Sequence, residues 1–264
     1  SDLARSGVQN THWGDGPKWR RFPELRDIET LEQFFKNRGY KTLGAGKIYH
    51  SQAPPWTPTS QVEANNWDFY YPSPYISHPY QIRAPKKIIY PKEVDNKRRP
   101  GEIDGSGETS WWTWGPLAVE DQKMADYHVV DWANYQLELD HKNPFFLAVG
   151  TWKPHDPWEV PQKYFDMYPL EKVFLPAHLD NDLIDSFDHG RRWIQEWVIN
   201  NNQWKKIVQS YAAAISFSDA MIGRLLDKLN KSKYADNTII VLWSDHGMHM
   251  GEKDNFEKFT LWER

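Results

Sequence analysis

The apolar positions of the chain follow helical spacing in three segments, 29–38, 120–139 and 204–229. In each segment they recur every three or four residues, which places them on one face of a helix. Thr30 fits the N-cap of the first helix, and Gly39 fits its C-terminal stop. The pattern therefore predicts three helices, the last of them long and amphipathic.

Three shorter segments, 40–48, 144–150 and 238–246, carry apolar runs typical of buried strands. The predicted helices precede or separate these runs. Alternating helices and buried strands favour an α/β fold, a doubly wound and mostly parallel sheet with helices on both faces. Residues 51–118 and 158–200 lack periodicity and are rich in proline or turn residues, so we expect long irregular insertions there.

Polar residues that can carry chemistry follow each predicted strand. Lys47 and His50 come after the first, His155 after the second, and Asp245 with His246 end the third. In an open α/β sheet the carboxyl ends of the strands meet at one edge. We therefore expect these side chains to converge, although an Asp-His-Gly sequence after a strand is often an ordinary polar turn.

Asp245 and His246 would offer an oxygen and a nitrogen ligand to a metal ion. Calcium and magnesium prefer oxygen ligands, whereas a directly ligating histidine suits zinc or manganese better. Lys47 and Lys258 are cations that suit a tetrahedral sulfate or phosphate group, although each alone is more often a surface lysine. His155 lies between two prolines that stiffen its loop, which would suit a general acid or merely a packed turn.

Composition narrows the function further. The chain has 32 Lys and Arg against 36 Asp and Glu, so it lacks the basic excess of a nucleic-acid-binding protein. No apolar run approaches the roughly 18 residues of a membrane span. It has no cysteine, which excludes a disulfide, a thiolate metal site or a cysteine nucleophile within these residues. Its 15 Trp, 13 Tyr and 12 Phe either staple loops to the domain or, in part, line a sugar-binding cleft.

Four motifs along the chain resemble the type I sulfatases of the alkaline-phosphatase superfamily, in particular iduronate-2-sulfatase-like enzymes. They are Gly-Lys-Ile-Tyr-His at 46–50, Lys-Pro-His at 153–155, Ile-Gly-Arg-Leu-Leu at 222–226, and Ser-Asp-His-Gly at 244–247 followed by Gly-Glu and Lys258. Singly these motifs are weak, but their order and spacing match the family along nearly the whole chain.

The resemblance implies a sulfuric ester hydrolase acting on a sulfated sugar or polysaccharide. From charge and hydropathy we expect no nucleic-acid or membrane partner. The resemblance also implies a role for each candidate residue. Asp245 and His246 would be half of a Ca²⁺ site, with Mg²⁺ less favoured. Lys47 and Lys258 would bind the sulfate group, and His155 would contact the sulfate and protonate the leaving alcohol. His50 would hydrogen-bond the formylglycine nucleophile of the family.

The sequence departs from the family at both ends. It lacks the Asp-Asp metal pair, the Cys/Ser-x-Pro-x-Arg motif that yields formylglycine, and the C-terminal sheet and helix. We therefore expect residues 1–264 to be a single partial catalytic domain that has no turnover by itself. By resemblance the enzyme would be periplasmic, extracellular or lysosomal, with its signal outside this segment.

Two alternatives stay open on the sequence alone. One is a phosphodiesterase or phosphonate hydrolase of the same superfamily, whose second metal would need further ligands such as His249. The other is a catalytically dead glycan-binding homologue that keeps the cleft and has lost the nucleophile. The identity of the residue at the upstream nucleophile position would separate them.

Overall fold

The structure is a computed structural model that describes residues 23–48, 66–71, 114–177, 179, 183 and 192–258. The chain divides into two compact units. The first unit comprises residues 1–89, 121–152 and 221–236; the second comprises residues 90–120, 153–220 and 237–264. Each unit is built around its own strands, and the long helix α6 (Trp204–Asn230) contributes residues to both.

The first unit contains a parallel three-stranded sheet in the order β2-β1-β4. Its strands are β1 (Lys41–Gly46), β2 (Phe69–Tyr71) and β4 (Phe145–Gly150). Leu43 of β1 lies opposite Phe69 on one side and Leu147 on the other. The α/β prediction with a parallel sheet is therefore confirmed, and β1 and β4 fall within the predicted strand segments.

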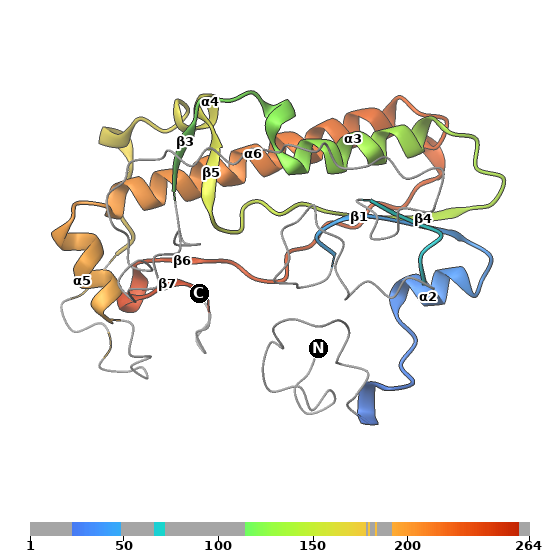
Figure 1. Ribbon diagram of the computed structural model, residues 1–264, viewed down its shortest axis with the longest axis horizontal. Helices are drawn as coiled ribbons and strands as arrows, with labels where there is room; N and C mark the ends of the chain where they lie inside the picture. Colours follow the sequence, from blue (N-terminus) through green and yellow to red (C-terminus); the bar gives the residue numbers. More distant parts are fainter. Residues whose placement is uncertain are drawn as a thin grey trace. The chain divides into compact units, whose positions relative to one another are not determined.

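Helices cover both faces of this sheet, as Figure 1 shows. Helix α3 (Ala125–Glu138) packs on one face around the buried side chains of Leu43 and Ala45. On the other face, helix α2 (Leu31–Lys36) places the Phe35 ring 4.7 Å from that of Phe146, centroid to centroid. The Thr30 hydroxyl accepts a hydrogen bond from the Gln33 N–H, which confirms the predicted N-cap.

The second unit contains two small two-stranded sheets. Strand β3 (Trp114–Leu117) pairs in parallel with β5 (Trp158–Pro161), and β6 (His249–Met250) pairs antiparallel with β7 (Phe256–Glu257). Helices α4 (Gln162–Phe165), α5 (Arg192–Asn200) and the first part of α6 complete it. Its core includes fully buried side chains from β5, α5 and α6, among them Trp158, Val160, Val198, Ile207 and Phe217.

Short 3₁₀ helices connect these elements at Pro23–Leu25, Asp121–Lys123, Leu170–Lys172, Ala235–Asn237 and Glu252–Asp254. The ranges 51–118 and 158–200, which the sequence predicts to be irregular, include β2, β3, β5, α4 and α5. That the chain forms a single partial catalytic domain stays a prediction. Among the helices that the structure describes, none has both the length and the apolar composition needed to cross a membrane.

The prediction of a buried strand over 238–246 is wrong. The backbone there is extended, but it has no ladder partner among the described residues, and the side chains of 239–243 are 56–91% exposed. β-favouring side chains do not create a strand where no neighbouring strand accepts their backbone hydrogen bonds. The apolar faces predicted for two helices also need correction, because Leu31, Phe34 and Ile215 are exposed.

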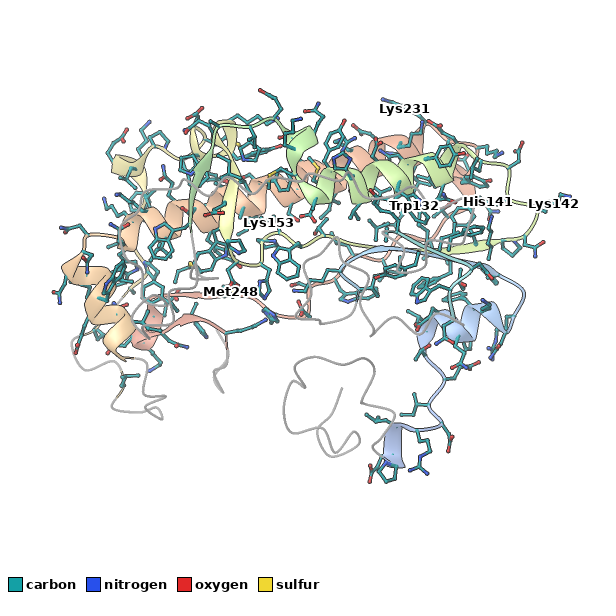
Figure 2. All side chains as sticks on the ribbon, viewed as in Figure 1. Trp132, His141, Lys142, Lys153, Lys231 and Met248 are labelled. Carbon is teal, nitrogen blue, oxygen red and sulfur yellow. The ribbon has the colours of Figure 1, made fainter. Side chains whose placement is uncertain are left out.

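His141 forms a polar cluster beside the sheet of the first unit (Figure 2). Its Nε2 lies 2.8 Å from the Gln136 carbonyl oxygen, which can only accept, so Nε2 carries the proton. Its Nδ1, 3.4 Å from the Lys41 Nζ, is then the acceptor of a lysine N–H. Burial lowers the pKa of His141, and the Lys41 charge lowers it further. The hydrogen bond to Gln136 raises this pKa but does not outweigh them. The folded protein therefore favours the neutral ring.

This lowered pKa predicts a loss of stability in mild acid. Below the ordinary histidine pKa of about 6.5, His141 binds a proton in the unfolded chain more readily than in the folded protein. The contribution of His141 to the free energy of unfolding is therefore complete above that pH and is lost below it. The urea midpoint should therefore fall less between pH 7.5 and 5.5 in His141→Gln than in the wild type. His128→Gln on α3 is the matched control. An unchanged pH dependence in His141→Gln would contradict the assignment.

Candidate active site

Four of the six residues predicted from the sequence lie in the second unit. His155 belongs to the loop that follows β4, Asp245 and His246 end the extended segment after α6, and Lys258 follows β7 directly. Lys47 belongs to the first unit, and His50 lies outside the described residues. The structure therefore tests the expected convergence only for the four residues of the second unit.

Lys258 lies between two imidazole rings. Its Nζ is 3.2 Å from His155 Nε2 and 3.0 Å from His246 Nε2. A lysine ammonium donates hydrogen bonds and cannot accept them, so both Nε2 atoms present a lone pair to it. His155 and His246, which lie 103 and 12 positions before Lys258 in the sequence, thus meet at one cation.

The other ring nitrogen of His246 fixes its tautomer. Nδ1 lies 2.8 Å from the Gly247 carbonyl oxygen and therefore donates to it. Burial lowers the pKa of His246; the Lys258 charge contributes to the lowering, while the hydrogen bond to Gly247 and the Asp245 carboxylate oppose it. The ring is consequently biased toward the neutral form with Nε2 unprotonated, which is the form that binds metal ions.

Asp245 and His246 fit part of a metal site. The Asp245 Oδ2 lies 3.4 Å from His246 Nε2, so an anionic oxygen and a neutral nitrogen lie together. Asp245 Oδ1 accepts a hydrogen bond of 3.1 Å from the His246 N–H, which orients the carboxylate. Across the part of the chain that the structure describes, no group of three or more acidic, histidine or cysteine residues comes together to hold a metal. These two residues could therefore supply only part of a coordination shell.

His155 has a partner that the sequence analysis missed. Its Nδ1 lies 2.8 Å from Asp156 Oδ1 and 2.9 Å from the Asp156 carbonyl oxygen. Asp156 is buried, with 4% of its surface exposed. The Lys-Pro-His-Asp-Pro sequence already places a carboxylate next to the histidine, so adjacency was the available signal.

The loop that carries His155 is held from several sides. The buried Lys153, labelled in Figure 2, donates to the Pro157 carbonyl. Ser218 Oγ on α6 donates to the Lys153 carbonyl at 3.0 Å, and Trp158 Nε1 donates to the Pro154 carbonyl at 3.0 Å. These bonds fix the backbone on both sides of His155 and thus limit where the imidazole can lie.

Lys258 is placed by a tight turn between β6 and β7. Gly251 has φ of +112°, and a Cβ at this position would lie 2.5 Å from the Trp204 ring. Trp204 Nε1 donates to the Met250 carbonyl at 2.6 Å, while the buried Glu252 accepts from the Met250 N–H at 2.6 Å. The turn is thus bonded to the start of α6 and sets where β7 delivers Lys258.

Lys47 lies at the end of β1, where its Nζ is 4.5 Å from the centroid of the Trp152 ring. The backbone N–H of Trp152 donates to the buried Asp126 Oδ1 on α3 at 2.8 Å. A cation over an aromatic face is attracted by the ring quadrupole. Trp152 and Asp126, which the sequence analysis did not select, therefore help to position this predicted anion-binding lysine.

Comparison with known proteins places this chain in a family. Residues 4–263 match the family model described as Sulfatase. The chain belongs to the sulfatase family. Members of this family are generally metal-dependent.

Sulfatases from distant organisms are similar to this chain. A protein named Sulfatase from Formosa agariphila is 38% identical over 245 residues, covering 90% of this chain and 45% of that protein. Human Iduronate 2-sulfatase is 28% identical over 254 residues, covering 89% and 43%. Choline-sulfatase from Rhizobium meliloti is 27% identical over 259 residues, covering 89% and 45%. The chain thus spans less than half the length of these curated relatives.

Proposed function

We propose that this sulfatase chain contributes to the hydrolysis of a sulfate ester on a sulfated sugar or polysaccharide. The observation that carries the proposal is the Lys258 ammonium, which lies within 3.2 Å of both His155 and His246. The fixed cation can bind a sulfate group, and an imidazole beside it can, once protonated, supply the proton that the departing alcohol requires. Family membership supplies the reaction class.

Each residue then has a role that follows from its chemistry. Lys258 neutralises the charge of the sulfate group. The family resemblance gives Lys47 the same role. His155, once its Nε2 has taken up a proton from solvent, protonates the leaving oxygen through that atom, while its Nδ1–H stays bonded to Asp156. Asp245 and His246 contribute ligands to a Ca²⁺ ion, with Mg²⁺ less favoured. A divalent cation held there would polarise the sulfate oxygens as a Lewis acid.

The nucleophile in this proposal is a formylglycine that lies outside the 264 residues. The chain contains no cysteine and no Cys/Ser-x-Pro-x-Arg sequence from which that residue could be made. Formylglycine would supply the nucleophile for attack on sulfur, and His50 would hydrogen-bond it, as the family resemblance implies. We accordingly propose that residues 1–264 alone have no sulfatase turnover.

The substrate class and the compartment are also proposals. The name of the human relative refers to a sugar acid, whereas that of the Rhizobium relative refers to choline. The 15 Trp and 13 Tyr of the chain offer flat apolar faces that suit sugar rings, which favours a carbohydrate. A periplasmic, extracellular or lysosomal location would bring such an enzyme to sulfated polysaccharides.

A phosphodiesterase of the same superfamily receives less support. His249, the candidate for an additional metal ligand, has its Nδ1 3.9 Å from Glu252 Oε2 in the β6–β7 turn. Within the described ranges it does not join Asp245 and His246 in a three-ligand group. A catalytically dead glycan-binding homologue would keep Lys258 as an anion-binding residue and is distinguished by the experiment below.

The decisive experiment begins with the coding sequence upstream of the Ser1 codon. A Cys/Ser-x-Pro-x-Arg motif preceded by an Asp-Asp strand end is expected there. The complete gene product, made together with a formylglycine-generating enzyme, should release sulfate from sulfated monosaccharides and leave phosphodiesters largely intact. A substituted nucleophile, with sugar binding but no sulfate release, would replace this proposal by the glycan-binding one.

Metal removal provides a further test. Dialysis of the complete gene product against EDTA should lower sulfate release by about 10²-fold or more, because a bound cation supplies several kcal/mol of charge stabilisation. Calcium should restore the rate, and Asp245→Asn should raise the calcium concentration needed for half-maximal recovery. Recovery with zinc and not with calcium would contradict the proposed ion. A rate that EDTA leaves unchanged would contradict metal dependence itself.

A further inference from the structure

We propose that Asp156 is a positioning residue that holds His155 in one tautomer, with Nδ1 protonated and Nε2 directed at the reacting group. The catalytic use of Nε2 rests on the proposed function. The assignment of the tautomer rests only on the contacts of His155. It adds to the sulfatase site a carboxylate whose only sequence signal was its position next to His155.

The tautomer follows from the two partners of Nδ1. Asp156 Oδ1 at 2.8 Å and the Asp156 carbonyl oxygen at 2.9 Å are both acceptors, so Nδ1 carries the hydrogen atom. In the neutral ring Nε2 is then a lone pair, in agreement with the Lys258 Nζ that lies 3.2 Å away and can only donate. The two sides of the ring give the same assignment independently.

Burial makes this contact a strong constraint. The Asp156 side chain is 5% exposed and that of His155 is 18% exposed, so water competes little for the hydrogen bond. A buried carboxylate is costly unless it is paired, and the Nδ1–H of the adjacent histidine supplies a partner. The bonds of Lys153, Ser218 and Trp158 to the loop backbone keep the two residues in place.

The contact has a defined consequence for the reaction. For proton donation, Nε2 first takes up a proton from solvent in place of its hydrogen bond from Lys258; the Nε2–H bond then breaks, a new O–H bond forms on the leaving oxygen, and the N–H electron pair stays on Nε2. The ring is left as the neutral Nδ1–H tautomer that Asp156 holds. Asp156 therefore supports proton donation at Nε2, which matters for a poor leaving group such as a sugar alcohol and little for a nitrophenol.

Asp156→Asn tests the inference with two substrates. In the complete gene product we expect kcat for a sulfated sugar to fall about 10²–10³-fold, within the roughly 10²–10⁴-fold that general acid catalysis contributes. The kcat for 4-nitrophenyl sulfate should change little, because its leaving group needs no proton. The matched control is Asp166→Asn on an exposed carboxylate that accepts from Gln162, which should leave both rates unchanged. Equal losses on both substrates, or no loss on either, would overturn the positioning role.

A spectroscopic measurement separates this inference from the proposed function. In the wild-type protein labelled with ¹⁵N-histidine, the His155 signals, assigned by their loss in His155→Gln, should report Nδ1 as the protonated nitrogen at neutral pH. Asp156→Asn should move them toward a mixture of tautomers, because an amide can present either N–H or oxygen to Nδ1. Protonation at Nε2 in the wild type would refute the inference even if sulfate release is observed. If no sulfate is released, the same spectra still decide whether Asp156 sets the tautomer.

Discussion

Replacing Lys258 by methionine is expected to lower kcat/KM for sulfate esters by about 10²–10³-fold, the loss seen when one preorganised donor to a developing negative charge is removed. Methionine keeps an unbranched chain of similar length but has no charge and no N–H. Both Nε2 atoms that lie within 3.2 Å of Nζ would lose their donor. Sulfate release by the complete gene product across a range of substrate concentrations measures the effect.

Lys231→Met provides the matched control for this substitution, since Lys231 is an exposed lysine just beyond the end of α6 (Figure 2). It should leave both kcat and KM unchanged. A Lys258→Met protein that folds normally and retains more than a tenth of the wild-type kcat/KM would show that this ammonium does not bind the sulfate group. The proposed site would then lose its central residue.

Gly251→Ala is expected to destabilise the second unit by about 3 kcal/mol or more. The backbone there has φ of +112°, a conformation that costs a residue with a Cβ about 1–3 kcal/mol. The new methyl group would also lie 2.5 Å from the Trp204 ring, which is already bonded to the Met250 carbonyl. Strain and steric overlap therefore add in the same turn. Urea unfolding followed by tryptophan fluorescence measures the change.

Gly223→Ala is the opposite case in the same protein. Gly223 lies inside α6, and apart from the adjacent residues and the backbone of its own helix no heavy atom lies within 4 Å of the Cβ that it would gain. Alanine there should stabilise the protein by about 0.5–1 kcal/mol, because glycine is a poor helix former. If both substitutions shift the urea midpoint in the same direction, the close approach of Trp204 to Gly251 is not correct.

Local patterns in the sequence were enough to predict elements whose stability is local. The Thr30 cap, the helical spacing in α3 and α6, and the apolar runs of β1 and β4 all describe interactions within a few residues or within one sheet. The strand prediction for residues 238–246 is wrong because a strand also needs a partner from elsewhere in the chain, which local patterns do not show. The prediction that Phe34 and Ile215 lie on covered helix faces is wrong for a related reason. Helical spacing shows which residues share a face, but it does not show what covers that face.

In the candidate site, too, the sequence predicted some residues, and others became apparent only in the folded structure. Sequence spacing and family resemblance selected His155, His246 and Lys258, and the structure brings these three together. Spacing did not select Asp156 or Trp152, because a carboxylate beside a histidine and a tryptophan beside a lysine are common in any sequence. Only the folded loop turns the Asp156 side chain back onto Nδ1 and places Trp152 under Lys47.

The exposed run Ile239–Trp243 has a consequence for how the protein behaves in concentrated solution. Five consecutive apolar residues with high β-propensity and no charge form the kind of segment that pairs between molecules and seeds aggregation. A charged gatekeeper placed within it would oppose such self-association. The run leads directly into Asp245 and His246, however, so a substitution chosen for solubility would also alter the approach to the candidate metal ligands. In this chain, solubility and the geometry of the candidate metal ligands therefore depend on one short segment.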